Sequence, residues 1–275
     1  AQGYELMAAS AAGFGSPTQM DRTVLAGVPA LYSAPGPGRV DSNRQTAAAF
    51  VEWLGARKPE QPFFSLLWFN HSDLDVGAIG PEPAPDGRYA GNPEARTRWN
   101  HYRRGLRLID AEIGRVLEAL DQKGERERTL ALVMGDHGFE FDDLGLGYYG
   151  HASNYGQYQL RTPLMMRWPR IAPRVFTHRT SHFDLPTTLL QDVLGCTNPP
   201  ADYGMGRNLF AGRSWDWIIA GSYHSWAIVE PGRVMVTAPG GLAEVLGPDY
   251  RDLPDPSLDA ALIESAFAEM RRFYR

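Results

Sequence analysis

The sequence contains a single cysteine, Cys196, so a disulfide within the chain is excluded. This absence fits a cytosolic protein and equally a bacterial periplasmic one. No apolar run reaches the roughly 18 residues that a membrane-spanning helix needs. The first residues, 1–4, have neither the basic start nor the apolar core of a secretory signal peptide. Because the sequence opens on a helix-like tail that runs straight into a strand, we expect it to be a fragment of a longer protein.

The sequence also lacks an excess of basic residues. The 275 residues include 27 Lys and Arg against 32 Asp and Glu, which gives a net charge of −5. This composition does not support a nucleic-acid partner, and there is no polybasic run that would bind anionic lipid. The apolar fraction of 43% is typical of a folded chain, and the length fits one large α/β domain or two small ones.

The most informative stretch of the sequence is 129–169. An apolar run at 130–134 is short enough to be a buried strand, and Asp136 and His137 follow just after it. A carboxylate and an imidazole are ligands that divalent cations accept, and α/β proteins place such sites at the carboxyl ends of parallel strands. His151, further along the same polar loop, is a second imidazole that the loop could bring back to the first pair.

A simpler interpretation of these residues is a turn. An Asp-His-Gly sequence after a strand turns well, because Asp can bond to its own backbone and Gly accepts positive φ. We expect the acidic residues that follow to be solvated rather than to bind metal; these are Glu140, Asp142 and Asp143. His182, in a later loop, is expected to be a hydrogen-bonded structural residue rather than a ligand.

Before this stretch, two buried strands are predicted at 4–10 and 62–70. The second ends in Asn70 and His71, so it also delivers an imidazole at its carboxyl end. A turn residue and a functional residue are equally good interpretations of His71. Helices are predicted from residue 41 to just before Pro59 and over 92–124, the second with a capping Asn, a Pro in its first turn and a long apolar stripe.

After this stretch, the pattern predicts a helix at 185–194 and then a meander of four short antiparallel strands. The strands are expected at 217–222, 226–230, 233–237 and 242–246, and a last amphipathic helix at 258–273. The sequence therefore predicts an α/β protein with a main core at 1–212. Residues 213–275, the antiparallel strands plus the terminal helix, are predicted to pack on that core as a small subdomain.

Together these motifs resemble the sulfatase and alkaline phosphatase superfamily. GDHG followed by GH and then TPLMMRWP is similar to the carboxyl-terminal half of that domain, and HYRRGLRLIDAEIGRVLEAL is similar to its long helix. TSHFDLPTTLLQDVLG is similar to a later segment of that domain, in which His, Asp, Pro and Thr follow one another at set intervals. The segment is one residue shorter in this sequence. The resemblance covers nearly the whole chain. It implies a sulfatase-like mixed sheet flanked by helices, with the amino-terminal part of the fold missing.

Two segments further resemble the YejM group of bacterial inner-membrane proteins, which carry a periplasmic sulfatase-like domain. They are GYYGHASNYGQYQLRTPLMMRWP and LLQDVLGCTNPPADYGMGRNLF. This resemblance implies a location on the periplasmic side of the inner membrane, with membrane spans outside this sequence.

The resemblance also implies roles for individual residues. Asp136 and His137 match the paired ligands of the superfamily's first metal ion, so a divalent metal (zinc, manganese, magnesium or calcium) is expected. His151 matches a histidine that touches a second metal or the substrate phosphate in the phosphoethanolamine-transferase branch, and His71 lies where that branch has Asn-His-Gly. His71 and His151 are therefore the expected catalytic residues. The superfamily's nucleophile and first acidic ligand lie upstream of this sequence, so we expect this chain by itself to be inactive.

The expected function of the parent protein is metal-dependent hydrolysis or transfer of phosphate or sulfate esters, with an ester or a lipid headgroup as its ligand. The alternative is a non-catalytic, sulfatase-like regulator that binds lipopolysaccharide or lipid A and signals through a partner protein. The presence of Asp136, His137 and His151 favours the first interpretation, whereas a whole protein without a nucleophile would favour the second. A third interpretation is a relative of the cytosolic phosphatases or the phosphoglycerate mutases. It is weaker, because residues 196–212 resemble the YejM group of inner-membrane proteins.

Overall fold

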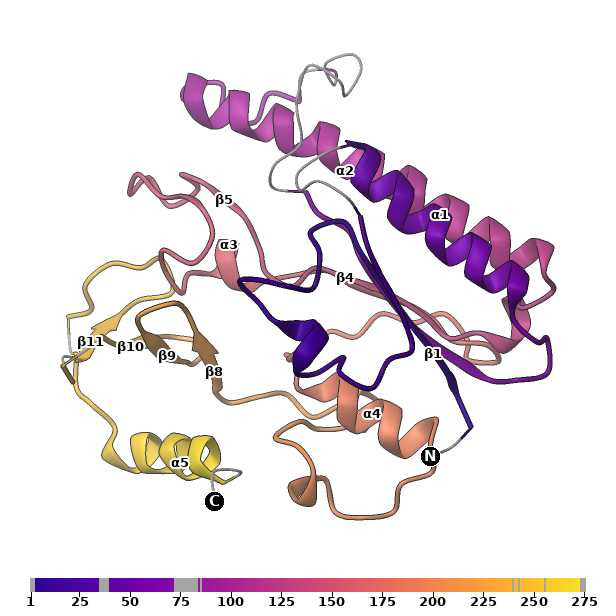
Figure 1. The fold of residues 1–275 in the computed structure, drawn as a ribbon. Coiled ribbons are helices and arrows are strands. Elements are labelled where there is room, and N and C mark those ends of the chain that lie inside the picture. Colours follow the sequence, from indigo (N-terminus) through magenta and orange to yellow (C-terminus); the bar gives the residue numbers. More distant parts are fainter. Residues whose placement is uncertain are drawn as a thin grey trace. The chain divides into compact units, whose positions relative to one another are not determined.

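The computed structural model describes residues 3–34, 40–71, 84, 86–238, 240–241, 243–254 and 256–272, drawn in colour in Figure 1. The chain forms two compact units, and each is described by itself. Unit 1 comprises Ala1–Leu132 and Met166–Arg170, and unit 2 comprises Val133–Met165 and Ile171–Arg275. The boundary between them passes through two strands that pair with each other, β4 (Ala131–Met134) and β7 (Leu164–Arg167).

Unit 1 is built on a three-stranded parallel sheet with the order β2-β1-β3. The strands are β1 (Glu5–Ser10), β2 (Ala30–Ser33) and β3 (Phe63–Trp68). β1 is central, and Met7 in its middle lies opposite both Ala30 and Ser65. Because a central strand is covered on both faces, its side chains are small or apolar, and Met7–Ser10 are all buried. The two strands predicted at 4–10 and 62–70 are confirmed.

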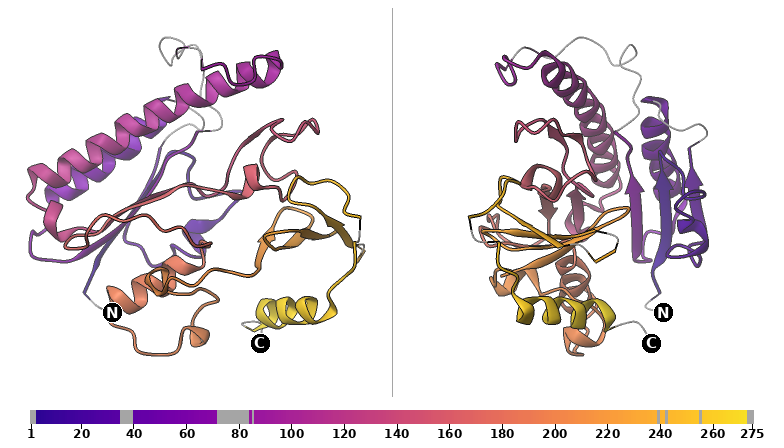
Figure 2. Two further views of the ribbon diagram at one scale, coloured as in Figure 1. Left: turned by 180° about the vertical axis from the view of Figure 1, so that it is seen from behind. Right: turned by 90° about the vertical axis from the view of Figure 1, so that its left-hand side faces the viewer.

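Two helices cover one face of this sheet, and an irregular segment covers part of the other. α1 (Val40–Ala56) and α2 (Pro93–Gln122) lie side by side in Figures 1 and 2. They share a core with the sheet that contains Met7, Ala9, Phe50, Leu54, Ala119 and Leu120. On the opposite face, Phe14 and Leu25 pack on Ala8, and the segment that carries them includes the short helix η1 (Met20–Arg22).

α2 forms as the sequence predicts. Asn92 lies just outside the helix in an extended conformation, and its side-chain oxygen accepts a hydrogen bond from the backbone N–H of Ala95 at 3.1 Å. After α2, the chain passes through η3 (Arg126–Arg128) into β4. None of the helices in the described ranges is both long enough and apolar enough to cross a bilayer.

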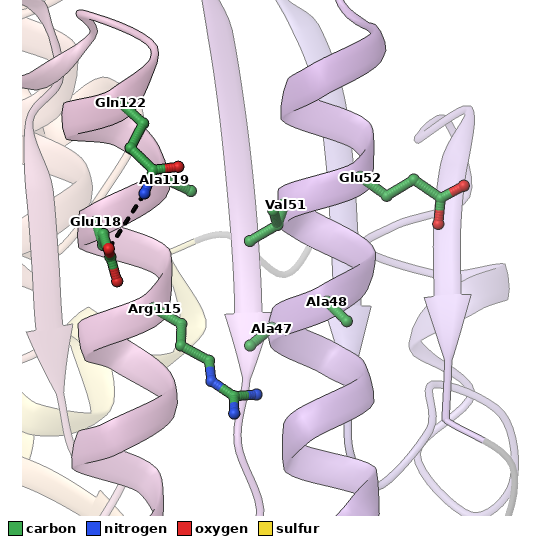
Figure 3. A pocket seen from close by; sticks show the side chains of 8 residues that line it. All are labelled: Ala47, Ala48, Val51, Glu52, Arg115, Glu118, Ala119 and Gln122. Atoms are coloured by element: carbon green, nitrogen blue, oxygen red, sulfur yellow. Dashed lines mark hydrogen bonds between the residues drawn. The ribbon is translucent and has the colours of Figure 1, made fainter.

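A groove of about 450 Å³ runs between α1 and α2 on the outside of unit 1. Figure 3 shows the small side chains of Ala47 and Val51 on α1 facing Arg115 on α2, with a hydrogen bond from Gln122 to Glu118 on α2. The residues that line the groove include none of the predicted site residues.

Unit 2 contains the long polar loop of the sequence and the antiparallel meander. The loop forms a hairpin whose strands have two residues each, β5 (Glu140–Phe141) and β6 (Tyr149–Gly150). The one-turn helix α3 (Gln157–Leu160) follows it. α4 (Asp184–Asp192) follows β7, and the short helices η4 (Pro200–Asp202) and η5 (Leu209–Ala211) lead to the meander.

The meander has the predicted antiparallel order β11-β10-β9-β8. Its strands are β8 (Ile218–Gly221), β9 (Trp226–Val229), β10 (Val234–Thr237) and β11 (Ala243–Leu246). Alternate side chains face opposite sides. Ile228 and Met235 pack on the final helix α5 (Ala260–Arg271), whereas Ala227, Val229 and Val234 pack against Tyr155 and Leu160 of the polar loop.

The compact units do not follow the division at 212 and 213 that the sequence predicts. Strands β8 to β11 share a buried cluster with Tyr155, so the meander and the loop at 133–165 belong to one unit. The physical reason is that the inner face of the meander is apolar and is covered by the loop that follows β4.

Candidate functional site

The first part of the candidate site is Asp136 and His137, which directly follow β4. The backbone N–H of His137 donates to Asp136 Oδ1 at 3.0 Å, so the carboxylate is fixed as a local turn acceptor. The imidazole Nδ1 lies 2.8 Å from the carbonyl oxygen of Gly138. Because a carbonyl only accepts, Nδ1 must carry the proton, which leaves the lone pair on Nε2. Nε2 lies 3.7 Å from Asp136 Oδ1, and both side chains are exposed to solvent.

The second part is His151, which follows β6. Its ring lies on the ring of His137, with 3.9 Å between the centroids and an angle of 20° between the planes. Burial lowers the pKa of His151, the neighbouring imidazole of His137 lowers it further, and the carboxylate of Asp136 opposes both effects. His151 is therefore neutral near pH 7, and the loop does bring the second imidazole back to the first pair.

Hydrogen bonds hold the turn of Asp136 and His137 from both sides. Before it, His182 Nε2 lies 3.0 Å from the carbonyl oxygen of Gly135 and donates to it. After it, the backbone N–H of Gly138 donates to the carbonyl oxygen of Gln159 at 2.8 Å. His182 is thus a hydrogen-bonded structural residue in this structure, as the sequence predicts.

The loop that carries His151 is held by four polar side chains, which we call the Gln159 network: Glu140, Ser153, Asn154 and Gln159. The prediction that Glu140 is solvated is wrong, because its exposed fraction is 0%. Its Oε2 accepts from Asn154 at 2.7 Å and from Gln159 at 2.8 Å, and these two amides replace water at that oxygen. Asp142 and Asp143 are in contrast only half-buried, and each accepts a hydrogen bond from a nearby backbone N–H of its own loop.

His71 lies in unit 1, just after β3. Its ring packs on Tyr102 of α2, with 4.3 Å between centroids, and its Nε2 donates to the Tyr102 carbonyl oxygen at 3.0 Å. Burial lowers the pKa of His71, the hydrogen bond to Tyr102 raises it, and the charge of His101 lowers it. The side chain of Asn43 fixes the preceding residue, because it both donates to and accepts from the backbone of Asn70, at 2.7 and 2.8 Å.

The structure therefore brings three of the four predicted site residues together in unit 2: Asp136, His137 and His151. His71 belongs to unit 1. Within the ranges that the structure describes, no three His, Cys, Asp or Glu side chains form a group that could enclose a metal ion.

Sequence reasoning missed the residues that support the site rather than those in it. Gln159, Asn154 and Asn43 make the bonds that position the histidines, but single amide side chains in helices or loops carry no motif. A local signal did exist at Gly138. A Cβ there would lie 2.2 Å from the carbonyl oxygen of Tyr158, so the glycine marks a close approach of two backbones.

This fold, with a carboxylate and an imidazole at the end of β4 and a second imidazole beside them, defines a class of protein. The sulfatase family model matches residues 7–195, well over half of the chain, and the chain belongs to the sulfatase family. This confirms the superfamily resemblance of the sequence and the sulfatase-like α/β fold with its small antiparallel sheet.

Among known proteins, the chain is similar to the inner membrane protein YejM of Salmonella typhimurium. The two are 25% identical over 274 residues, which is 99% of this chain and 42% of YejM. The chain thus spans less than half of the length of this relative.

Two solved structures share the fold. One is a protein of the alkaline phosphatase superfamily from Vibrio parahaemolyticus, with a TM-score of 0.63 and 18% identity, covering 98% of this chain and 66% of that one. The other is the lipoteichoic acid synthase LtaP from Listeria monocytogenes, with a TM-score of 0.62 and 12% identity, covering 98% of this chain and 68% of that one.

Proposed function

We propose that this chain carries part of the active site of a metal-dependent hydrolase or transferase for phosphate or sulfate esters at the bacterial envelope. The observation that carries the proposal is the stacked pair of His137 and His151 beside Asp136, at the end of β4 in a sulfatase-family fold. We further propose that the whole protein acts on the periplasmic side of the inner membrane, because the similar protein YejM is an inner membrane protein.

The donor atoms of Asp136 and His137 fit a divalent ion. Ligands that lie about 2.0–2.2 Å from one ion are no more than about 4.4 Å apart. The 3.7 Å between Asp136 Oδ1 and His137 Nε2 meets this limit, and the hydrogen bond from Nδ1 to Gly138 keeps the lone pair on Nε2. Two residues do not complete a coordination sphere, so the proposal requires further ligands. When bound, the ion supplies Lewis-acid polarisation of an ester oxygen.

In this proposal, His151 acts on the ester itself. A neutral imidazole beside a metal-type pair can donate a hydrogen bond to an anionic phosphoryl or sulfuryl oxygen, whereas giving a proton to the leaving oxygen requires the protonated form. The lowered pKa of His151 favours the neutral form, which still carries one N–H to donate. His71 would have a similar charge-stabilising role in unit 1, where α2 fixes its ring.

The test is a calorimetric titration of zinc and manganese into the chain and into the double variant Asp136→Ala, His137→Ala. A matched control is Asp216→Ala, His224→Ala, which removes an exposed Asp and an exposed His elsewhere in unit 2. We expect binding that the first double variant abolishes and the control retains. Equal binding by all three proteins would count against a metal site at Asp136 and His137.

A second candidate is a sulfatase-like regulator that binds lipopolysaccharide or lipid A and signals through a partner protein. The similarity to YejM along 99% of the chain favours it. Titration with vesicles that contain lipid A distinguishes the two candidates. A regulator would bind them without added metal, and its binding would survive the loss of Asp136 and His137.

A further inference from the structure

Gln159 lies between the two loops that carry the histidine pair, and it bonds to both. Its backbone carbonyl accepts the N–H of Gly138, one residue after His137, at 2.8 Å. Its side-chain oxygen accepts the backbone N–H groups of Ser153 and Asn154 at 3.0 and 3.3 Å, just after His151. A single residue thus fixes the backbone next to each imidazole.

The side chain of Gln159 is itself held in one orientation by buried partners. Its exposed fraction is 3%, and its Nε2 donates to Glu140 Oε2 and to Ser153 Oγ, both at 2.8 Å. Because an amide reversed by rotation would point its N–H groups at the N–H groups of Ser153 and Asn154, only one orientation satisfies the bonds. Glu140, a pure acceptor when ionised, selects that orientation.

Glu140 also holds the other side of His151. In the β5–β6 hairpin, the backbone of Glu140 pairs with that of Gly150, which is the residue just before His151. The residues on both sides of this histidine, Gly150 and Ser153, are therefore bonded to members of the same network. Such a buried polar network is rigid when complete and unfavourable when one partner is lost.

We infer that Gln159, oriented by Glu140, is a positioning residue that keeps the imidazoles of His137 and His151 in contact. The inference rests on the proposed function for what the pair does. The ring contact itself is measured without metal or substrate.

The experiment changes each of the two side chains in turn. In Gln159→Glu, two carboxylates face each other, so the bond between positions 140 and 159 is lost. In Glu140→Gln, the amide oxygen can take the place of Oε2 and still accept from Asn154 and Gln159, so the bond is kept without the buried charge. Gln159→Glu therefore tests the loss of the network, and Glu140→Gln is its matched control.

The readout is the contact between the rings, measured by nuclear magnetic resonance on the 275-residue chain with labelled histidine. In the parent chain we expect a cross-peak between ring protons of His137 and His151, which lie in stacked rings 3.9 Å apart. Gln159→Glu should remove it, and Glu140→Gln should keep it. Zinc affinity should follow the same order, with a loss of about tenfold or more in Gln159→Glu.

The control is Asn208→Ala, which removes hydrogen bonds to Gln191 and Asp192 elsewhere in unit 2. It should lower thermal stability and leave the ring cross-peak in place. A cross-peak that persists in folded Gln159→Glu, or that is lost in Glu140→Gln, would overturn the inference. If Gln159→Glu does not fold, Gln159→Met takes its place, because it keeps the length of the side chain and removes its hydrogen bonds; an unchanged cross-peak in that variant would also overturn the inference.

The outcome separates this inference from the proposed function. Ring contact that depends on Gln159 in a chain that binds neither zinc nor manganese would support the positioning role and contradict the metal site. Metal binding that is unchanged in Gln159→Glu, with the ring contact intact, would support the metal site and contradict the positioning role.

Discussion

Gly138 lies where two backbones meet, and the space for its missing side chain is already filled. A Cβ at this position would lie 2.2 Å from the carbonyl oxygen of Tyr158 and 2.9 Å from that of Arg161. These are backbone atoms of α3 and its end, so they cannot rotate away. We expect Gly138→Ala to lower the free energy of unfolding by about 2 kcal/mol or more, and chemical denaturation would measure the change.

The matched control for this prediction is Gly114→Ala. Gly114 lies in the middle of α2, and a Cβ there would meet nothing within 4 Å. Alanine in a helix is more favourable than glycine by up to about 1 kcal/mol, so this variant should be as stable as the parent or more stable. Equal effects of the two substitutions would contradict the close approach at Gly138.

His71 gives unit 1 a pH dependence whose sign follows from its environment. Burial is the main cause that lowers its pKa below the ordinary value of 6.5. Between the lowered pKa and 6.5, the unfolded chain binds a proton at this residue and the folded chain does not. The contribution to stability is therefore present above about pH 6.5 and is lost as the pH falls toward the folded-state pKa.

Denaturation curves from pH 7.5 to pH 5 would test this effect. The free energy of unfolding of the parent chain should fall more steeply over this range than that of His71→Gln. Glutamine cannot titrate but can still donate to the Tyr102 carbonyl. Parallel curves for the two proteins would show that His71 does not titrate differently in the folded and unfolded states.

At the residue scale, the sequence identifies the chemically reactive side chains better than it predicts which side chains are buried. Asp136, His137 and His151 can be picked out because carboxylates and imidazoles after a strand are rare and chemically informative. The burial of Glu140 could not be predicted, because acidic residues in loops are normally solvated. Its partners, Asn154 and Gln159, are 14 and 19 residues further along the chain, and only the folded loop brings them together.

At the scale of elements, the N-terminus of α2 offers a prediction. The side chain of Asn92 satisfies the N–H of Ala95, which has no partner within the helix. Asn92→Ala should lower the free energy of unfolding by about 1 kcal/mol, whereas Asn92→Asp should keep the cap and place a negative charge at the positive end of the helix. Thermal unfolding of both variants would measure the difference, and equal losses would show that the cap contributes little.

The elements that the sequence predicts well have a long or strict hydrophobic period. α2 presents apolar residues every three or four positions over 30 residues, and the four meander strands alternate between two buried faces. The hairpin of β5 and β6 was not predicted, because two-residue strands are too short to show a period. Its pairing depends on Glu140 and Gly150, which are brought together by the turn of the loop.

At the scale of the whole molecule, the sequence predicts the fold class through its order of strands and helices, but not the division into units. Composition changes near residue 212, where the meander begins, and that change predicts a boundary. The compact units depend instead on which surfaces are apolar. Tyr155 is 3% exposed because it packs against Ala227, Val229 and Val234, and no local signal connects residues so far apart.

This packing leads to a prediction for a chain that ends at residue 212. The loop at 133–165 would lose the apolar cover of the meander and three hydrogen bonds from it: Tyr155 to Ser225 at 2.8 Å, Ser222 to the Ala152 carbonyl at 2.8 Å and Arg251 to the Leu144 carbonyl at 2.7 Å. Since Ala152 directly follows His151, we expect the loop to open and the histidine contact to be lost.

Limited proteolysis of the parent and truncated chains would measure this opening. New cleavage sites should appear within 133–165 in the truncated chain, while 3–34 and 40–71 stay protected by their own core with α2. Tyr155→Phe in the full chain is a graded comparison, because it keeps the ring and loses only the bond to Ser225, at a cost of about 1 kcal/mol. A truncated chain with a protected loop would mean that the core at 1–212 folds by itself. The meander would then not be needed to hold the loop that carries His151.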